Sequence, residues 1–440
     1  MRLVHLGVGS FFRAHQAWYT DHASDAAEWG YAAFTGRSAA VADVLDEQDG
    51  VYTLLVRAPD GSVPEVLSVL SAVHPGDDVE ALRGYLASPD VAVVTTTVTE
   101  AGYRRNESGG LDLDSEPVRQ DVAVITGAQS GEPSTAPGRL VDGLRARRAA
   151  DAGPVAIVPC DNVPDNGAMV ARVVRDLADR VDPDLAAWVD DHVAFVTTMV
   201  DRITPRTTDD DTAEVRRLMG VDDRSVVVTE PFTEWVLSGE FPAGRPRWED
   251  AGARFVEDIH PFETRKLWML NGAHSLLAYA GSALGHQTVA EAMGDDEVRG
   301  WVDEWWSDAG RHLPLPAHEI AAYRQALVDR FQNPQMRHLL AQIASDGSQK
   351  VPIRILPALR AARDAGELPI GATRVVAAWV VHLRGRGAPV DDVQADTVVP
   401  LGAGSVGDAV VAVLRHLGVD DPDVAALVER QVTEIDQAGA

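Results

Sequence analysis

The chain has 440 residues, enough to bury large cores and to divide into two or three domains. Its 67 acidic and 39 basic side chains give a net charge of −28, which argues against nucleic acid or an anionic membrane as a partner. The single cysteine, Cys160, excludes a disulfide framework and a cysteine-rich zinc site. No run reaches the roughly 18 apolar residues of a membrane span, and the chain opens on a strand pattern rather than a signal segment, so we expect a cytoplasmic protein.

The first 257 residues alternate between strand and helix patterns. We expect strands at 3–6, 31–34, 51–56, 68–73, 91–98, 155–158 and 195–200, and helices that include 13–21, 140–150 and 165–180. The run 91–98 (VAVVTTTV) is almost wholly β-branched, which is typical of a buried parallel strand. Segment 126–137 is expected to form a surface loop. Strands that alternate with helices and end in polar residues predict a Rossmann-like parallel α/β sheet.

From Pro261 onward the pattern is almost wholly helical. We expect helices at 262–284, about 287–311, 317–331, 335–345, 353–364, 372–385, 405–417 and 422–437, with a break at 386–389. The change of pattern predicts a dinucleotide-binding Rossmann-like domain over residues 1–257. A mainly α-helical domain that binds substrate and carries the catalytic groups is expected over residues 258–440.

Two glycines, Gly7 and Gly9, lie where the first strand meets the first helix. Glycines at this point let the backbone approach a pyrophosphate, and a helix N-terminus favours its negative charge. The third position of the usual fingerprint is Phe12 rather than glycine, so an ordinary strand–turn is the alternative. The residues that we expect at the dinucleotide site are Gly7, Gly9, Ser10, Phe11 and Arg13.

The segment after the second strand bears on the choice between NAD and NADP. An acidic residue here usually holds the ribose 2′-hydroxyl of NAD, but this chain has no acid between Phe34 and Asp43. Arg37 is able to meet a 2′-phosphate, and the alternative is a solvated loop residue, so both cofactors remain open. Thr97 and Glu100, at the end of run 91–98, are also expected at the cofactor, with a strand-end cap as the alternative for Glu100.

Lysine is rare in this chain: only Lys266 and Lys350 occur among the 39 basic residues, and the other 37 are arginines. Arginine stays protonated at any working pH, whereas a desolvated lysine can lose its proton. In an α-helix that advances about 100° per residue, Glu263, His274 and Asn271 fall about 60°, 80° and 140° from Lys266. Polar groups on an otherwise apolar face must be paired or line a cavity. We therefore expect an active site on this helix, with a solvated face and a buried histidine as the alternative.

The chemistry of these side chains suits the oxidation of a secondary alcohol. Such a reaction needs a base for the hydroxyl proton while hydride leaves to a nicotinamide, and burial favours the neutral form of a lysine, so Lys266 is the candidate base. Asn271 can donate a hydrogen bond to the developing alkoxide. His274 can bind a neighbouring hydroxyl or orient the lysine. Glu263 can exchange the proton with solvent, or simply be a first-turn carboxylate favoured by the helix dipole.

The pattern Lys-x4-Asn-x2-His after an α/β domain resembles the polyol-specific long-chain dehydrogenases. This family includes mannitol 2-dehydrogenases, arabinitol dehydrogenases, mannitol-1-phosphate 5-dehydrogenases, and fructuronate and tagaturonate reductases. Five further motifs carry the resemblance: 7–15 (GVGSFFRAH), 99–103 (TEAGY), 160–162 (CDN), 199–205 (MVDRITP) and 346–350 (DGSQK).

The resemblance implies a metal-independent dehydrogenase, often monomeric, with Lys266 as the acid/base. It also implies an oxyanion hole formed by Asn162 and Asn271, and substrate hydroxyls near Asp201, His274 and Lys350. From the residues alone, Asn162 and Asp201 follow or end predicted strands, where ligands bind in open sheets. A turn residue, a salt bridge and a surface charge are the respective alternatives for Asn162, Asp201 and Lys350.

We therefore expect an NAD(P)-dependent enzyme, without a metal and as a monomer or small homo-oligomer, that interconverts a polyol and a ketose of the mannitol–fructose kind. A reductase of fructuronate or tagaturonate is the second reading, with Lys350, Arg354 or Arg337 as the cation for the carboxylate. A mannitol-1-phosphate 5-dehydrogenase, a 6-phosphogluconate-type enzyme and an inactive nucleotide-sensing module are further alternatives. Short-chain dehydrogenases need Tyr-x3-Lys, which is absent because Phe262 and Asp346 stand four residues before the two lysines.

Overall fold

The computed structural model describes residues 1–36 and 38–439, so Arg37 lies outside the described residues. The chain forms two compact units, Met1–Ile259 and His260–Ala440. Within the described part of the chain, no helix combines the length and the apolar character that crossing a bilayer requires.

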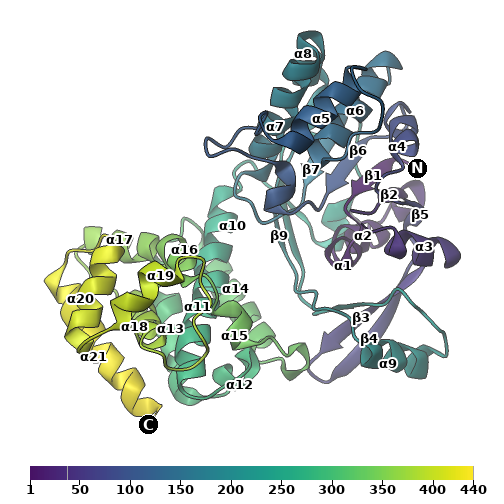
Figure 1. Ribbon diagram of the computed structural model, residues 1–440. Helices are drawn as coiled ribbons and strands as arrows, with labels where there is room; N and C mark the ends of the chain where they lie inside the picture. Colours follow the sequence, from purple (N-terminus) through teal and green to yellow (C-terminus); the bar gives the residue numbers. More distant parts are fainter. Residues whose placement is uncertain (37, 440) are drawn as a thin grey trace. The chain divides into compact units, whose positions relative to one another are not determined.

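Unit 1 is built on a six-stranded sheet in which every neighbouring pair is parallel (Figure 1). Its strands are β1 (Leu3–Leu6), β2 (Tyr31–Phe34), β5 (Leu70–His74), β6 (Val93–Thr96), β7 (Val155–Pro159) and β8 (Val193–Phe195). Their order is β5-β2-β1-β6-β7-β8, which is the Rossmann order 3-2-1-4-5-6. The order reverses between β1 and β6, the point where such sheets bind dinucleotides. The predicted parallel α/β fold is confirmed.

Two hydrophobic cores cover the two faces of this sheet, because successive side chains of a strand point to opposite faces. Leu3 and Tyr31 belong to one core, and their neighbours Val4 and Ala32 belong to the other. The second core is covered by α4 (Val79–Leu86), α5 (Glu116–Ile125), α6 (Ala136–Ala149), α7 (Asn166–Val181) and α8 (Pro183–His192) (Figure 1). The first core includes residues of α1 (Ser10–Ala14), α2 (Gln16–Asp21) and α3 (Ala40–Glu47). Burial on both faces explains why the strands are continuous apolar runs.

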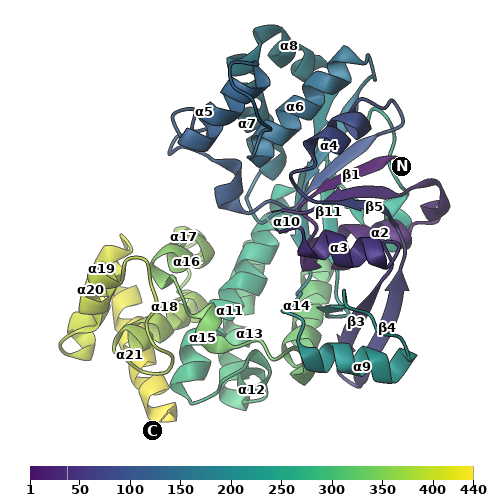
Figure 2. The same cartoon turned by 45° about the vertical axis from the view of Figure 1, so that its right-hand side comes forward.

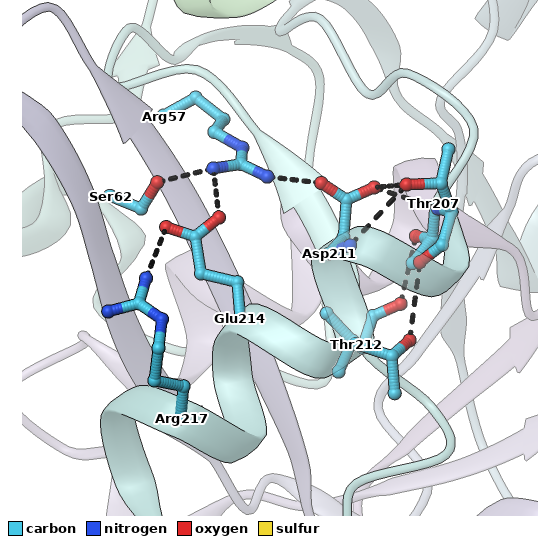
Figure 3. Close-up of polar contacts among 9 residues, drawn as sticks. Arg57, Ser62, Thr207, Asp211, Thr212, Glu214 and Arg217 are labelled. Atoms are coloured by element: carbon cyan, nitrogen blue, oxygen red, sulfur yellow. Dashed lines mark hydrogen bonds and ion pairs between the residues drawn. The ribbon is translucent and has the colours of Figure 1, made fainter.

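Two small sheets complete unit 1. The hairpin β3 (Tyr52–Ala58) and β4 (Gly61–Leu67) pairs with β10 (Val227–Thr229), and β9 (Thr197–Asp201) pairs with β11 (Glu234–Ser238), which pairs in turn with β12 (Arg254–Phe255). Helix α9 (Asp209–Met219) lies along the hairpin (Figure 2). Figure 3 shows the contact that holds it: Arg57 of β3 donates to Ser62 Oγ (2.5 Å) and Glu214 Oε2 (2.5 Å), and also pairs with Asp211.

One predicted strand is wrong in its extent. The run 195–200 was expected to be continuous, but the chain breaks at Val196, between β8 of the parallel sheet and β9 of a small antiparallel sheet. The segment 195–200 (FVTTMV) has strand-forming residues on both sides of Val196, so the sequence carries no signal for the residue at which the chain leaves one sheet for another.

Unit 2 is mainly helical, as predicted. Its first helix has four consecutive parts: α10 (His260–Arg265), η4 (Lys266–Gly272), α11 (Ala273–Leu276) and η5 (Leu277–Gly281). The remaining elements are α12 (Val289–Met293), α13 (Asp296–Arg311), α14 (Ala317–Phe331), η6 (Pro334–Met336), α15 (Leu340–Ile343), α16 (Gly347–Arg354), α17 (Leu356–Asp364), α18 (Ile370–Leu383), α19 (Ala395–Val398), η7 (Val399–Gly402), α20 (Val406–His416) and α21 (Pro422–Ala438).

Helix α18 is the centre of unit 2. All its residues from Gly371 to Leu383 are buried, and it packs against α13 and α21, as expected for a helix that is apolar on every side. The predicted helix 287–311 is interrupted before α13, where the carboxylate of Asp295 accepts from the backbone N–H groups of Glu297 and Val298. That capping interaction starts a new helix.

Candidate active site

The turn after β1 requires glycine at its first position. Gly7 has a φ of +113°, a conformation that side chains disfavour. A Cβ atom at Gly7 would also lie only 2.6 Å from the carbonyl oxygen of Thr97, which follows β6. At Gly9, the residue that precedes α1, a Cβ would meet nothing closer than 3.7 Å. The first glycine therefore lets β1 and β6 close on each other at the point where the strand order reverses.

A buried histidine beneath this turn fixes its backbone. His5 Nδ1 lies 2.8 Å from Thr95 Oγ1, and its Nε2 lies 3.1 Å from Thr97 Oγ1, which donates to the Gly7 carbonyl at 2.7 Å. Because Thr97 has one hydroxyl proton and gives it to Gly7, the ring must donate through Nε2–H and accept at Nδ1. Burial lowers the pKa of His5 to about 3, so the ring is neutral. Sequence reasoning missed His5, although a polar residue inside a buried strand was a visible signal.

A cavity of about 630 Å³ lies at the carboxyl ends of β1, β2 and β6. Gly7 and Thr97, both predicted for the cofactor, line it. Its charged lining residues among the described ones are Asp77, Arg104 and Arg139. Position, size and the close approach of the Gly7 backbone suit the binding of a dinucleotide.

Ser10, Phe11, Arg13 and Glu100, also predicted for the cofactor, are not among the residues that line this cavity. Ser10 and Phe11 begin α1 after Gly9, and Glu100 is exposed at the start of the short 3-10 helix Glu100–Tyr103 (η2). Arg13 is buried and donates from Nη1 to Ser225 O (2.6 Å) and Ser225 Oγ (2.7 Å). These contacts tie α1 to the loop before β10.

The motifs 99–103 and 160–162 are joined at the carboxyl edge of the sheet. The hydroxyl of Tyr103 donates to Asp161 Oδ2 (2.7 Å), and the Val163 N–H donates to Asp161 Oδ1 (3.0 Å). Burial raises the pKa of Asp161. Asn162, the predicted oxyanion donor, follows this carboxylate and is exposed. The predicted substrate residue Asp201 is buried at the end of β9. The sequence analysis included Asp161 and Tyr103 in these two motifs but gave neither residue a role.

In unit 2, the helical spacing assumed for the catalytic residues is wrong. Residues Lys266–Gly272 form a π-helix, not an α-helix. A π-helix is hydrogen-bonded from i to i+5 and is rare outside functional sites. Lys266 and Asn271 are five residues apart, so they lie one hydrogen-bonded turn from each other instead of about 140° apart around an α-helix. Both are partly exposed.

His274 lies in the α-helical segment that follows and is buried. Its ring stacks on Phe331 (centroids 4.7 Å apart) and meets His338 edge-on (5.0 Å). Burial, and then the nearby charges of His338, Arg330 and Arg354, hold the pKa of His274 well below its ordinary value. The ring is therefore neutral, and its Nε2 has no hydrogen-bond partner within the described residues.

Lys350 and Glu263 have partners within unit 2. Lys350 Nζ donates to Ile343 O (3.2 Å), Ser345 O (2.5 Å) and Ser345 Oγ (3.1 Å). Burial, and then the charge of Arg354, lower the pKa of Lys350. These bonds close the loop that leads into motif 346–350. Glu263 is half-buried and pairs with His260 Nδ1 at 3.3 Å.

The chain combines a Rossmann sheet that has a cavity where the strand order reverses with a helical unit that carries lysine, asparagine and histidine on one helix. This combination is that of a nicotinamide-dependent dehydrogenase. Residues 1–250 match the model of the mannitol dehydrogenase Rossmann domain, and residues 258–437 match that of the mannitol dehydrogenase C-terminal domain. The chain belongs to the mannitol dehydrogenase family. The predicted family and the predicted class of enzyme are confirmed.

Relatives and solved structures support the assignment over most of the chain. D-mannonate oxidoreductase of Escherichia coli K12 is 37% identical over 398 residues, which cover 87% of this chain and 80% of the relative. D-arabinitol 4-dehydrogenase of Ralstonia nicotianae is 36% identical over 393 residues, which cover 87% and 83%. A substrate-free D-sorbitol dehydrogenase structure has a TM-score of 0.92 at 30% identity and covers 100% of this chain and 94% of its own. Pseudomonas fluorescens mannitol 2-dehydrogenase, solved with NAD and D-mannitol, has a TM-score of 0.78 at 31% identity and covers 99% and 92%.

Proposed function

We propose that this protein interconverts a polyol and a ketose with NAD or NADP. Residues 1–257 bind the dinucleotide and contribute Asn162 and Asp201 to the substrate, and residues 258–440 carry the acid/base group and the other substrate groups. The observation that carries the proposal is the π-helical turn, which sets Lys266 and Asn271 one turn apart, followed by the neutral His274. A mannitol 2-dehydrogenase solved with NAD and D-mannitol shares the fold, which supports this substrate class.

A nicotinamide dinucleotide held in the cavity beside Gly7 and Thr97 would supply the hydride acceptor or donor for the proposed reaction. The amine of Lys266 takes the hydroxyl proton as the alcohol is oxidised and gives it back during reduction. The amides of Asn271 and Asn162 donate to the substrate oxygen as negative charge develops. Nε2 of His274 binds a neighbouring hydroxyl, and a neutral ring can do so as either donor or acceptor. Glu263 passes the proton to solvent.

Two further groups complete the substrate site in this proposal. Asp201 accepts hydrogen bonds from hydroxyls farther along the polyol. Lys350 already donates to Ile343 and Ser345, so its proposed contribution to the substrate is to hold the loop before motif 346–350. The enzyme needs no metal in this scheme and works as a monomer or small homo-oligomer in the cytoplasm.

Substitution of Lys266 tests the acid/base role. We expect Lys266→Arg and Lys266→Met to lower kcat by roughly 10²–10⁴-fold, the usual contribution of a general base. The dissociation constant of the dinucleotide should stay the same, because the cavity that we assign to it is formed by unit 1. The matched change at the other lysine, Lys350→Arg, should act mainly on KM and stability. Near-native kcat in Lys266→Met would refute the assignment.

A second candidate substrate is a sugar acid. Two cationic side chains, Arg330 and Arg354, act on His274, although the chain as a whole carries a net charge of −28. Such a local concentration of positive charge suits a carboxylate, and one relative is a D-mannonate oxidoreductase. Arg337, another predicted cation, is exposed.

Steady-state rates distinguish these readings. The rates are measured with mannitol, sorbitol, arabinitol and mannonate, each with NAD and with NADP. This one set of measurements gives both the substrate preference and the cofactor preference. A kcat/KM for mannonate at least tenfold above that for every polyol would favour the sugar acid. Turnover of mannitol 1-phosphate alone would favour a phosphate substrate. Dinucleotide binding without turnover of any substrate would indicate a sensing module.

A further inference from the structure

The π-helical turn η4 accepts hydrogen bonds from a neighbouring helix. Two consecutive residues of α13 donate through their indole N–H groups: Trp305 Nε1 to the carbonyl of Trp268 and Trp306 Nε1 to the carbonyl of Met269, each at 2.9 Å. Both donors are almost fully buried, with exposed fractions of 0% and 1%. Their rings are therefore fixed by packing, and so are the N–H groups.

A third donor reaches the end of the same turn. Arg354 of α16 donates from Nη1 to the carbonyl of Asn271 (3.2 Å) and to Ser275 Oγ (3.2 Å). The Ser275 hydroxyl donates to the same Asn271 carbonyl at 3.2 Å. Side chains from two other helices thus contact three backbone carbonyls within four consecutive residues of η4.

These donors are unusual because η4 is not a helix end. It is preceded by α10 and followed directly by α11. In a helix interior the backbone N–H groups occupy the carbonyls, and side-chain donors to carbonyls belong to the last turn. Here, three side-chain donors contact an interior turn. This turn is the segment in which the backbone hydrogen bonds change from the i+4 pattern of an α-helix to the i+5 pattern of a π-helix.

The packing around the turn is equally specific. A Cβ atom at Gly272 would lie 2.5 Å from the ring of Trp305, so glycine is needed for the indole to reach its carbonyl. The ring of Trp306 also lies 6.0 Å from that of Phe331, the aromatic residue on which His274 stacks. The indoles therefore support both the turn and the packing of His274.

We propose that Trp305, Trp306 and Arg354 are positioning residues that keep this turn π-helical and so keep Asn271 one turn from Lys266. The inference rests on the proposed acid/base role of Lys266. If the turn relaxed to an α-helix, Asn271 would rotate to about 140° from Lys266. Its amide would then no longer reach the substrate oxygen whose proton Lys266 takes or gives. Loss of the donors should therefore lower the rate of the chemical step and spare dinucleotide binding.

The test removes the indole N–H and keeps an aromatic ring. We expect Trp305→Phe and Trp306→Phe each to lower kcat by roughly 10–100-fold, because a displacement of about 1 Å can cost 10²-fold. The apparent pKa in the pH profile of kcat should shift, and the dissociation constant of NADH should change less than about twofold. Arg354→Met, which removes the third donor, serves as the second variant if a tryptophan variant does not fold.

Trp301→Phe is the matched control. Trp301 lies on the same helix, is buried, and packs against Arg374 with the guanidinium carbon 5.2 Å from its ring centroid. We expect it to lose thermal stability like the other two variants but to keep the native kcat and pH profile. Equal kcat in Trp301→Phe, Trp305→Phe and Trp306→Phe would overturn the positioning role. Near-native turnover in Lys266→Met would instead refute the proposed function, so the two failures are distinguishable.

Discussion

Replacing Gly272 by alanine should destabilise the protein, although this exchange normally stabilises a helix. Alanine is favoured over glycine in a helix interior by about 0.5–1 kcal/mol. At Gly272, however, the new Cβ would lie 2.5 Å from Cζ2 and 2.8 Å from Nε1 of Trp305, whereas carbon atoms in contact are about 3.5–4.0 Å apart. The indole must retreat by about 1 Å, and that movement breaks its 2.9 Å hydrogen bond to the carbonyl of Trp268.

The expected size of the effect follows from three contributions. Overpacking of a core costs about 1–3 kcal/mol, and loss of a buried hydrogen bond costs about 1 kcal/mol. The helix preference for alanine offsets up to about 1 kcal/mol, so the free energy of unfolding should fall by about 1–3 kcal/mol. For a domain of this size, that is a decrease in Tm of about 2–4 °C per kcal/mol. Urea unfolding followed by tryptophan fluorescence measures it, and kcat should fall in the same variant.

Gly300→Ala is the matched control for Gly272→Ala. Gly300 lies on α13, is exposed, and a Cβ there would meet nothing within 4 Å. The same substitution should therefore raise stability by up to about 1 kcal/mol and leave kcat unchanged. If Gly272→Ala proved as stable as Gly300→Ala, Trp305 would not be held against the π-turn as described.

Two more predictions concern histidines that the structure makes neutral. His5→Leu removes the ring N–H that fixes Thr97 and, through it, the Gly7 carbonyl. We expect dinucleotide affinity to fall by about tenfold, the effect of roughly 1.4 kcal/mol, and calorimetric titration that gave a native affinity would contradict this. For His274, the lowered folded pKa means that its contribution to stability is present above its ordinary pKa of about 6.5 and is lost as pH falls through the lower folded value. Ring NMR signals of His274 should therefore show no titration around pH 6.5, and a full titration there would refute the neutral assignment.

Burial decides which strands and helices the sequence could predict. The parallel strands were visible because both faces of the sheet are buried, so each strand is a short apolar run. Helix α9 was not predicted, because only Asp211 and Val215 are buried along its length and no apolar stripe results. The break at Val196 was not predicted for a different reason: strand-forming residues, many of them β-branched, stand on both sides of it.

The sequence could name the candidate residues, but it could not predict the geometry of the helix that carries them. Lys266 stood out because lysine is so rare in an arginine-rich chain. In our proposal, the π-turn around Lys266 depends on Trp305 and Trp306. Their hydrogen bonds join residues 37 positions apart in the sequence, so no local sequence pattern predicts the π-turn. An assumed α-helical spacing placed Asn271 at the far end of the polar arc, about 140° from Lys266. The contacts of His5 were equally unpredictable, because its partners Thr95 and Thr97 lie on and just after another strand, β6.

In both units, buried neutral donors fix part of the backbone at the candidate site, although Arg354, the third donor to the π-turn, is charged. In unit 1, the neutral His5 acts through Thr97 on the carbonyl of Gly7. In unit 2, the indoles of Trp305 and Trp306 act on carbonyls of the π-turn. A buried charge in either place would carry a large desolvation cost and would change the field felt by a charged cofactor or a proposed base nearby. A neutral N–H orients a carbonyl without that field, so we expect substitution of these donors to act through geometry, and the shifted apparent pKa of the tryptophan variants to follow from the displaced turn.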